Sequence, residues 1–476
     1  MSFTTALKWS FLAELSTKFV QPLVFIALAR LLVPEDFGVM TAALMVVAFS
    51  QIFWEVGMGK ALIQRRTHIE EAANAAFWIN LILATAIAFS LYMSSTLVAI
   101  AVFQDARVAA VLQAMSVQII LSALCSVQTA LLQKEMSFKK IFWVRFVTVS
   151  LPGIASVPLA WYGWGYWALV TGTLFGQAVQ VFMLWRVTRW KPHFQFDFAI
   201  AKEISKFSSW VGITGILLWF YQWADSLIVG VYFGGHELGL YRMGNQLVTA
   251  VFALLLVPIV PVLYSLLVVS DLKEKKLSAH YNDLVNKVIL VGVLLSVLVF
   301  VIFYFGSNFM FGEKWAGLGF VGAFFGLIHG YAWIVGFNGE YYRAAGKPHL
   351  ETVALSVSMV FYILGYLIFA PIGLEEFVFA RFALVFIGVF IHLYCVSTIV
   401  EVDFFRLFKN LLFTSLCAIS CIFLAFLFWG NVRQDLFGVI FLSVATFLIY
   451  LAGIFLINKR EVLIFYFSVK LVVYDK

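Results

Sequence analysis

Charged and amide side chains lie at helical spacing inside the first long apolar stretch of the sequence. Glu14, Lys18 and Gln21 occupy positions i, i+4 and i+7, so they share one face if the stretch is helical. A charge inside a membrane is costly and normally faces a cavity or a partner. The three residues therefore predict either one wall of a polar cavity or a Glu14–Lys18 salt bridge near the start of the helix.

Two further carboxylates are candidates for binding a proton or a cation. Asp225 is the most deeply placed acidic residue, in the run GILLWFYQWADSLIVGVYF, where Gln222 and Ser226 accompany it. It predicts either a coupling site for an ion or one half of a structural pair. Glu55 lies near the end of its own apolar stretch, where it either takes part in coupling or pairs with Lys60.

A third carboxylate belongs to a stripe of polar and aromatic residues. His329, Trp333, Gly336, Glu340 and Arg343 repeat at helical spacing and share one face. The run GFNGE within this stripe contains two glycines and an asparagine, which weaken a helix. Such a break at membrane depth usually lines a cavity. Arg343 at its end suits an anion, although the usual placement of basic residues at the inner membrane face predicts an arginine there too.

Other basic and aromatic residues are candidates for holding a ligand. Arg242 and Asn245 lie on one side of a further apolar stretch. Arg242 predicts either an anion contact or a side chain that extends its charge to the membrane interface. Most aromatic residues, 18% of the chain, are expected to face lipid or the interfacial belts. Trp223 and Trp333 are candidates for stacking on a ligand if they point inward.

The elements that position these residues follow from composition. Hydrophobic residues make up 63% of the 476 and charged residues 12%, with a mean hydropathy of +0.98, too little polar surface for a soluble domain of this length. Crossing a bilayer takes about 20 apolar residues in a helix, and continuous apolar runs disfavour a barrel. The sequence thus predicts an all-α polytopic membrane protein. We expect fourteen transmembrane helices, approximately at residues 11–32, 39–59, 75–99, 109–132, 141–162, 164–185, 207–232, 243–268, 284–306, 317–341, 350–371, 377–399, 408–429 and 435–457.

Basic residues predict the orientation of these helices. Loops that carry lysine and arginine stay on the cytoplasmic side, and most of the 32 basic residues fall in alternate loops and the two termini. Both termini are therefore expected in the cytoplasm. The first stretch contains Glu14 and Lys18 and lacks a small-residue cleavage site, so it is not expected to be a cleaved signal. The topology explains the net charge of +7, and the expected neighbours are anionic lipids, with no nucleic acid.

The sequence contains no nucleotide-binding loop, catalytic triad or metal-binding cluster. Its cysteines, Cys125, Cys395, Cys417 and Cys421, fall in predicted spans without a disulfide framework or metal-ligand spacing. The chain is therefore expected to be a transporter without a cofactor, and not an enzyme. Its energy must come from a proton or sodium gradient, from the membrane potential acting on a charged cargo, or from consumption of the cargo outside.

One turn occurs twice in the chain. LLVPEDFGVM at 31–40 and YFGGHELGLY at 232–241 align at an offset of 201 residues, which also places Gln21 on Gln222. Turn chemistry alone favours an acidic cap and a glycine at such corners. The matching position, orientation and spacing favour a duplication instead, with two halves of the same orientation related by an axis along the membrane normal.

Longer runs carry a family resemblance. The runs ALARLLVPEDFGVMTAALMVVAFSQIFWEVGMGKALIQRR, ALLQKEMSFKK, YGWGYWALVTGTLFGQ, LWRVTRWKPHF and DSLIVGVYFGGHELGLYRMGNQL resemble the polysaccharide-exporting branch of the multidrug/oligosaccharidyl-lipid/polysaccharide exporter superfamily. They are similar to Wzx-type flippases of the colanic-acid and succinoglycan kind. The resemblance implies two six-helix lobes around a central cavity, two extra C-terminal helices, and translocation of an undecaprenyl-diphosphate-linked oligosaccharide repeat unit.

The resemblance and the two longest inward loops imply a domain organisation. We expect an N-terminal six-helix lobe at 1–190, a cytoplasmic linker at 191–206, a C-terminal six-helix lobe at 207–400, and two additional helices with a cytoplasmic tail at 401–476. The protein would lie in the bacterial cytoplasmic membrane as a monomer. Its partners would be the lipid-linked oligosaccharide, membrane lipids and a polysaccharide polymerase complex.

If the cargo is a lipid-linked oligosaccharide, the candidate residues fall into two groups, one for binding the cargo and one for coupling transport to an ion. The residues expected to bind diphosphate or sugar are Lys18, Gln21, Gln222, Arg242, Asn245, Trp333, Arg343 and Arg381. The residues expected to couple a proton or sodium ion are Glu14, Glu55, Asp225 and Glu340. A multidrug or small-cation antiporter of the same superfamily is the alternative, and it predicts an acidic cavity. A membrane polymerase or ligase would need a substantial external loop, and the predicted outer loops are short.

Overall fold

A computed structural model describes residues 20–55, 58–193, 198–256 and 274–457, together with single helical positions at 260, 263 and 267. Helical residues 198–214 are described by their backbone only. The candidate residues Glu14 and Lys18 lie outside the described part of the chain. All regular elements within the described part are helices.

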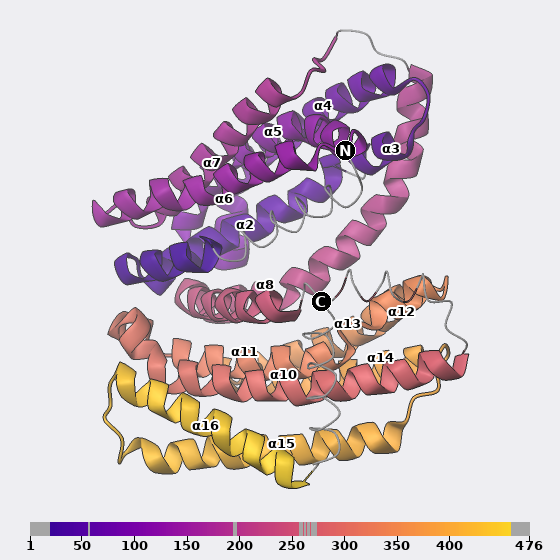
Figure 1. Ribbon diagram of the computed structural model, residues 1–476. Coiled ribbons are helices and arrows are strands. Elements are labelled where there is room, and N and C mark those ends of the chain that lie inside the picture. The colour runs from indigo at the N-terminus through magenta and orange to yellow at the C-terminus, as the bar shows by residue number, and fades with distance from the viewer. Residues whose placement is uncertain are drawn as a thin grey trace. The chain divides into compact units, whose positions relative to one another are not determined.

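The described residues of the first half of the chain form a short helix at Val20–Leu31 and seven labelled helices. These are α2 (Pro34–Glu55), α3 (Met58–Gln64), α4 (Ile69–Val98), α5 (Ala106–Lys134), α6 (Phe138–Trp161), α7 (Tyr166–Val187) and α8 (Phe198–Leu256). The second half contains α10 (Glu274–Phe311), α11 (Leu318–Ala332), α12 (Asn338–Ala344), α13 (His349–Phe369), α14 (Leu374–Val396), α15 (Phe404–Trp429) and α16 (Leu436–Ile457). Figure 1 shows this order.

The predicted fold class is confirmed. Within the described residues, 12 helical segments are long and apolar enough to cross a membrane. One of them, Gly215–Leu254, is 40 residues long and contains a non-helical residue, Gly234, at φ 83° and ψ −173°. Glycine adopts this backbone conformation without the penalty that a side chain brings. The long segment therefore comprises two arms, which correspond to two of the spans predicted from sequence.

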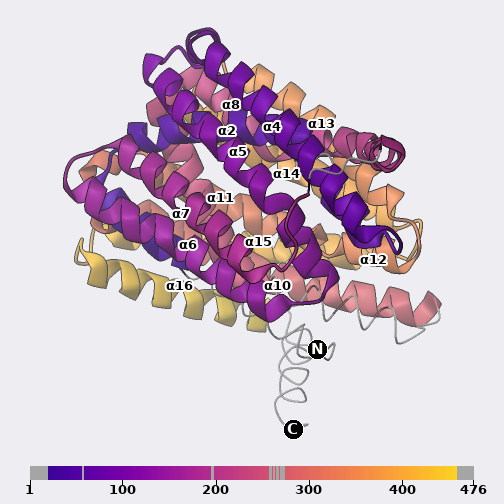
Figure 2. The same ribbon diagram turned by 90° about the horizontal axis from the view of Figure 1, so that it is seen from above.

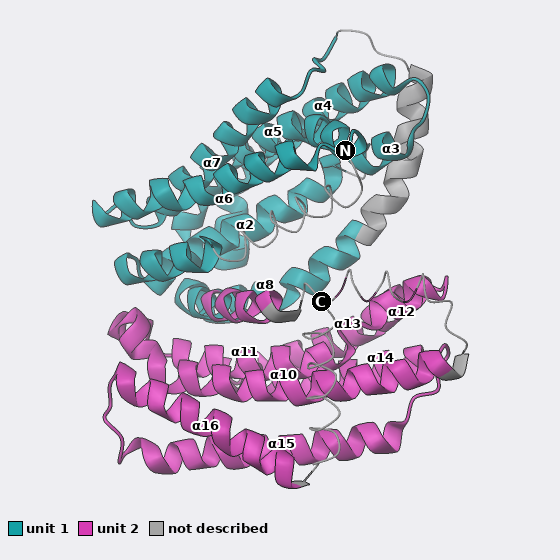
Figure 3. Ribbon diagram, in the orientation of Figure 1, with its two compact units in different colours: residues 1–242 teal, residues 243–476 magenta. Residues whose placement is uncertain are grey.

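The chain divides into two compact units, residues 1–242 and 243–476 (Figure 3). The boundary falls in the second arm of α8, so the first arm belongs with the helices before it. Trp219 on that arm donates a hydrogen bond to the carbonyl of Met45 in α2 at 3.2 Å, and its ring lies 4.9 Å from that of Phe49. The lobe boundaries expected from the sequence remain predictions.

In unit 1, α5 packs against α2, α4 and α7, and α6 packs on α7. Figure 2 shows α2, α4 and α5 running side by side. Lys134 at the end of α5 donates to the carbonyls of Leu62 at 3.1 Å and Ile63 at 3.0 Å, and also to that of Arg65. These carbonyls lie at the C-terminal end of α3, where a cation is favourable. Lys134 thus anchors α3 to α5.

In unit 2, α10 and α11 form a closely packed pair, and α11 also packs on α14. The two C-terminal helices, α15 and α16, pack on α10 and on each other. Small polar contacts join α10 to α15, where the side chain of Asn410 donates to that of Asn286 at 2.6 Å. The additional helices predicted from sequence are therefore part of the packing of unit 2.

Candidate functional site

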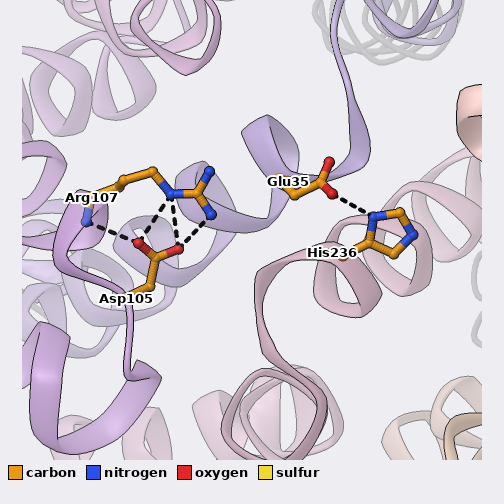
Figure 4. A network of polar contacts seen from close by, with 4 residues as sticks. All are labelled: Glu35, Asp105, Arg107 and His236. Carbon is orange, nitrogen blue, oxygen red and sulfur yellow. Dashed lines mark hydrogen bonds and ion pairs between the residues drawn. The ribbon is translucent and has the colours of Figure 1, made fainter.

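The two copies of the repeated turn meet inside unit 1. The Nδ1 atom of His236 lies 2.7 Å from Oε1 of Glu35 (Figure 4), and the two residues are 201 positions apart, the offset of the repeat. Both side chains are partly exposed. An imidazole N–H at this position donates to the carboxylate, and the charge of the carboxylate makes the contact charge-assisted.

Glycines allow the two turns to approach each other closely. A Cβ atom at Gly38 would overlap the carbonyl oxygen of Gly235, and a Cβ atom at Gly239 would overlap that of Pro34. The offset of 201 relates Gly38 to Gly239 and Pro34 to Gly235, so the two contacts are reciprocal. Preferences for turn residues do not require such reciprocity, whereas a two-fold arrangement of duplicated turns does. The structure thus supports the interpretation of the repeat as a duplication.

Asp105 and Arg107 flank the repeated turns. Asp105 caps α5 by accepting from the backbone N–H of Arg107 at 2.9 Å, and its carboxylate also pairs with the Arg107 guanidinium at 2.8 Å (Figure 4). Partial burial raises the pKa of the Asp105 carboxyl, but the hydrogen bonds and charge of Arg107 outweigh burial and lower that pKa overall. The void between these residues and the turns measures only about 10 Å³, so this end of unit 1 is closely packed.

A much larger cavity lies toward the C-terminal ends of α2 and α5, away from the repeated turns. Its volume is about 690 Å³, within the range of about 300–1,000 Å³ that is usual for small-molecule sites. Side chains of α2, α3, α5 and α7 form its wall, together with Gly215 of α8. Its polar lining consists of Gln51, Glu55, Lys60, Gln118, Ser122, Ser126, Thr129, Gln133, Gln177 and Gln180.

The lining is polar but close to neutral. Five glutamines and three hydroxyl side chains face one carboxylate, Glu55, and one ammonium group, Lys60. Amides and hydroxyls both donate and accept hydrogen bonds. Gln51 donates to Glu55 through its side-chain amide, and Gln177 contacts the thiol of Cys125 at 3.9 Å. The cavity therefore presents a dense set of donors and acceptors with little net charge.

Two polar atoms of cavity-lining residues are buried without a hydrogen-bond partner among the described residues. They are Nε1 of Trp54 and Oε1 of Gln118, and Trp54 is only 1% exposed. An unpaired buried polar group costs about 1–3 kcal/mol, so each such group in a native protein requires an explanation. Both atoms have almost no accessible surface, so they lie inside the wall of the cavity and do not face its interior.

The structure places the candidate residues of unit 1 in different surroundings. Glu55 lines the cavity, whereas Gln21 and Gln222 are exposed on their helices. Asp225 is buried and accepts from the Tyr241 hydroxyl at 2.9 Å. Arg242 lies with its guanidinium 4.0 Å from the ring centroid of Trp223.

The helix that carries the polar stripe predicted in unit 2 is broken in the structure. A short 3-10 segment, Trp333–Val335, separates α11 from α12, as the glycines and asparagine of GFNGE predicted. Arg343 pairs with Glu340 at 2.7 Å and with Glu351 at 3.0 Å. Two carboxylates therefore already hold the guanidinium that was expected to bind diphosphate.

The remaining candidate residues of unit 2 pack against neighbours within that unit. Trp333 contacts Phe337, with ring centroids 5.4 Å apart, and Arg381 lies over the ring of Phe325 at 4.8 Å. Asn245 accepts from Thr249 at 3.2 Å and contacts His329 at 3.0 Å. The predicted roles of these residues in binding remain predictions.

The residues that build the cavity are mostly ones that the sequence did not single out. Gln118, Gln177 and Gln180 are uncharged, and a search for intramembrane charges passes over them. The available signal was the occurrence of glutamines inside predicted spans 109–132 and 164–185. Among the residues that the structure describes, no group of three or more His, Cys, Asp or Glu side chains has a metal-binding arrangement.

Comparison with known proteins gives consistent results. The family model described as polysaccharide biosynthesis protein matches residues 27–318. Among curated proteins, the succinoglycan biosynthesis transport protein ExoT of Rhizobium meliloti is 28% identical over 238 residues, 50% of this chain and 48% of ExoT. The lipopolysaccharide biosynthesis protein WzxC of Escherichia coli is 23% identical over 317 residues, 65% of this chain and 63% of WzxC. The matched region thus spans less than two thirds of these relatives.

Solved structures share the fold. The lipid II flippase MurJ in an inward closed conformation superposes with a TM-score of 0.78 at 15% identity, covering 96% of this chain and all of MurJ. An inward-facing multidrug resistance transporter of the MATE family gives a TM-score of 0.62 at 12% identity, covering 81% of this chain and 98% of that transporter. The arrangement of helices therefore matches that of these two structures.

Proposed function

Because the chain belongs to the polysaccharide biosynthesis protein family, we propose that this multi-pass membrane protein flips lipid-linked oligosaccharides. The cargo would be an undecaprenyl-diphosphate-linked repeat unit, moved by alternating access from the inner to the outer leaflet of the bacterial cytoplasmic membrane. The product would feed exopolysaccharide, O-antigen or capsule synthesis. Support for this proposal comes from the transporters that share its family and fold.

The observation that carries the proposal is the polar cavity within the helices of unit 1. A lipid-linked oligosaccharide has a polar headgroup, which is costly to expose to hydrocarbon. Its lipid tail can stay in the bilayer while a protein cavity shields the headgroup. A scaffold without a polar cargo has no need for ten polar side chains around one intramembrane space.

The position of the cavity favours entry from the cytoplasm. Its lining reaches Lys60 and Gln133, beside the basic residues Arg65, Arg66 and Lys134, which the distribution of positive charge assigns to the inner face. The repeated turn at the start of α2 lies 22 helical residues away, roughly 30 Å along the axis. We infer that the cargo enters unit 1 at its inner end while the turn contact closes its outer end.

Coupling and diphosphate binding are further parts of the proposal. Asp225, Glu55 and Glu340, with Glu14, would couple transport to a proton or sodium gradient. Lys18, Arg242, Arg343 and Arg381 would attract the diphosphate. Arg343 already pairs with two carboxylates, so a diphosphate would have to displace one of them or use the remaining N–H donors of the guanidinium. The protein would work as a monomer beside a polysaccharide polymerase.

Accumulation of cargo in cells tests the flippase function. Cells that lack the gene should collect lipid-linked repeat units on the inner leaflet, and a plasmid copy should clear them. Thin-layer chromatography of the lipid fraction, combined with accessibility to an impermeant reagent in spheroplasts, gives the leaflet distribution. If the loss of the gene leaves the amount of inner-leaflet cargo unchanged but alters the resistance of the cells to cationic drugs, the multidrug antiporter is favoured instead.

A further inference from the structure

We propose that the cavity of unit 1 binds the sugar part of the cargo, as a site for uncharged hydroxyl groups, and that the diphosphate is held elsewhere. This inference rests on the proposed function and adds the chemical class of ligand that the cavity selects. It depends on two observations: the amide-rich lining and its balance of charge.

The lining matches the hydrogen-bonding chemistry of a sugar. Each sugar hydroxyl donates one hydrogen bond and accepts others, and a glutamine amide does both through separate atoms. Gln118 of α5 and Gln177 and Gln180 of α7 contribute such amides to one cavity. Amides from two helices are thus available to hydroxyls that point in different directions.

The charge of the lining does not suit a diphosphate. A dianion in a low-dielectric site requires more than one cation or a set of backbone donors. Lys60 is the one cationic side chain among the residues that line the described cavity, and Glu55 is present with it. Gln51 donates to Glu55, which keeps an acceptor oriented in the wall. A carboxylate at this place repels phosphate oxygens but accepts readily from sugar hydroxyls.

Two buried polar atoms of lining residues have no hydrogen-bond partner among the described residues. The indole Nε1 of Trp54 only donates, and Oε1 of Gln118 only accepts, and both are buried without partners within the described chain. A sugar hydroxyl could reach either atom only after its side chain turns toward the cavity, so the inference does not depend on them. A drug ammonium has hydrogen-bond donors but no acceptors, so it would leave the amide N–H groups of the lining unpaired, and the cavity is better suited to a carbohydrate.

Substitution of the amides tests this inference in a flipping assay. Gln118→Leu, Gln177→Leu and Gln180→Leu keep most of the side-chain volume and remove the donor and acceptor. Each should reduce the flipping rate by about tenfold, because removing one partner of a buried hydrogen bond also leaves the other unpaired. Gln113→Leu is the matched control, since Gln113 lies on the same helix with similar partial burial but does not line the cavity.

A binding measurement identifies which part of the cargo occupies the cavity. A Ser122→Cys substitution, made in full-length protein whose four native cysteines are replaced by alanine, places a thiol in the cavity wall. The probes are the oligosaccharide that mild acid releases from the lipid-linked pool, and inorganic pyrophosphate. The oligosaccharide should slow maleimide labelling at position 122 several-fold, and pyrophosphate should not. A cysteine at Asn431, which is exposed in unit 2, should react equally under all conditions.

The outcomes separate this inference from the flippase function. Protection by pyrophosphate, or by neither probe, overturns the sugar site. Leucine variants that are stably produced and flip cargo at the rate of Gln113→Leu overturn it as well, while the flippase function stands. If the wild-type protein itself moves no cargo, the proposed function fails, whichever probe protects Ser122→Cys.

Discussion

Glu35 and His236, which the internal repeat equates at a separation of 201 residues, contact each other at 2.7 Å within unit 1. A pair of repeated residues can meet in this way only close to an axis that relates the two copies. The reciprocal approach of Gly38 and Gly239 to the opposite backbone places the same axis between the two turns. The repeat in the sequence is therefore also a physical contact, and it closes one end of the unit that contains the cavity.

Because Gly38 and Gly239 each lie against the opposite backbone, alanine substitution at either position should destabilise the protein to a similar extent. Gly38→Ala and Gly239→Ala should each destabilise the protein by about 1–3 kcal/mol, because an added methyl group must displace the opposite backbone. Thermal unfolding of purified protein in detergent measures this effect. Gly430→Ala is the control, because nothing lies within 4 Å of a Cβ atom there. Midpoints for Gly38→Ala and Gly239→Ala equal to that of the control would refute the contact.

The lowered pKa of Asp105 predicts a pH-dependent contribution to stability. A carboxyl group whose pKa is lower in the folded state stabilises the protein above its unfolded pKa of about 4. The contribution is lost as pH falls through the folded pKa. Asp105→Asn keeps a good helix cap and removes the charge. Its loss of stability relative to the wild-type protein should therefore be largest near pH 7 and should become smaller below pH 4. A deficit that grows on acidification would contradict this account.

Asp225 should reveal its role through gradient dependence. If it couples an ion, Asp225→Asn should abolish the dependence of flipping on a proton or sodium gradient imposed across proteoliposomes. Tyr241→Phe removes only the hydroxyl that donates to Asp225, so it should retain gradient dependence even if it lowers stability. An Asp225→Asn protein that responds to the gradient like wild type would leave this carboxylate a structural partner of Tyr241.

Arg343 is expected to affect both stability and export. Arg343→Ala leaves Glu340, which is 8% exposed, without the guanidinium 2.7 Å away and should cost about 1–3 kcal/mol. Arg343→Lys should impair export less than alanine does, without restoring it fully if the diphosphate contact is bidentate. Glu351→Gln serves as a control that weakens the salt bridge but keeps the arginine. Normal export by a well-produced Arg343→Ala protein would remove Arg343 from the binding site.

The sequence was sufficient to predict the repeat and the spans that the structure describes, whereas most of the predicted span 11–32 lies outside the described residues. Apolar runs of about 20 residues indicate helices that cross a bilayer. The glycines and asparagine of GFNGE predicted the break between α11 and α12. A polar cavity was expected, but its glutamine-rich lining in unit 1 was not predicted, because neutral glutamines such as Gln118 give no charge signal and their convergence depends on how α5 and α7 pack. Nor did helical spacing indicate that Glu351, on the next helix, would pair with Arg343.

The measurement that tests the account most directly is the leaflet distribution of cargo in proteoliposomes. Lipid-linked oligosaccharide from the producing cells would be reconstituted with purified protein, and an impermeant periodate reagent would oxidise only outward-facing sugars. Protein-containing vesicles should render nearly all of the cargo accessible over time, whereas protein-free vesicles should protect the inner-leaflet share. Equal protection in both kinds of vesicle, with the protein shown to be folded, would contradict the assignment as a flippase.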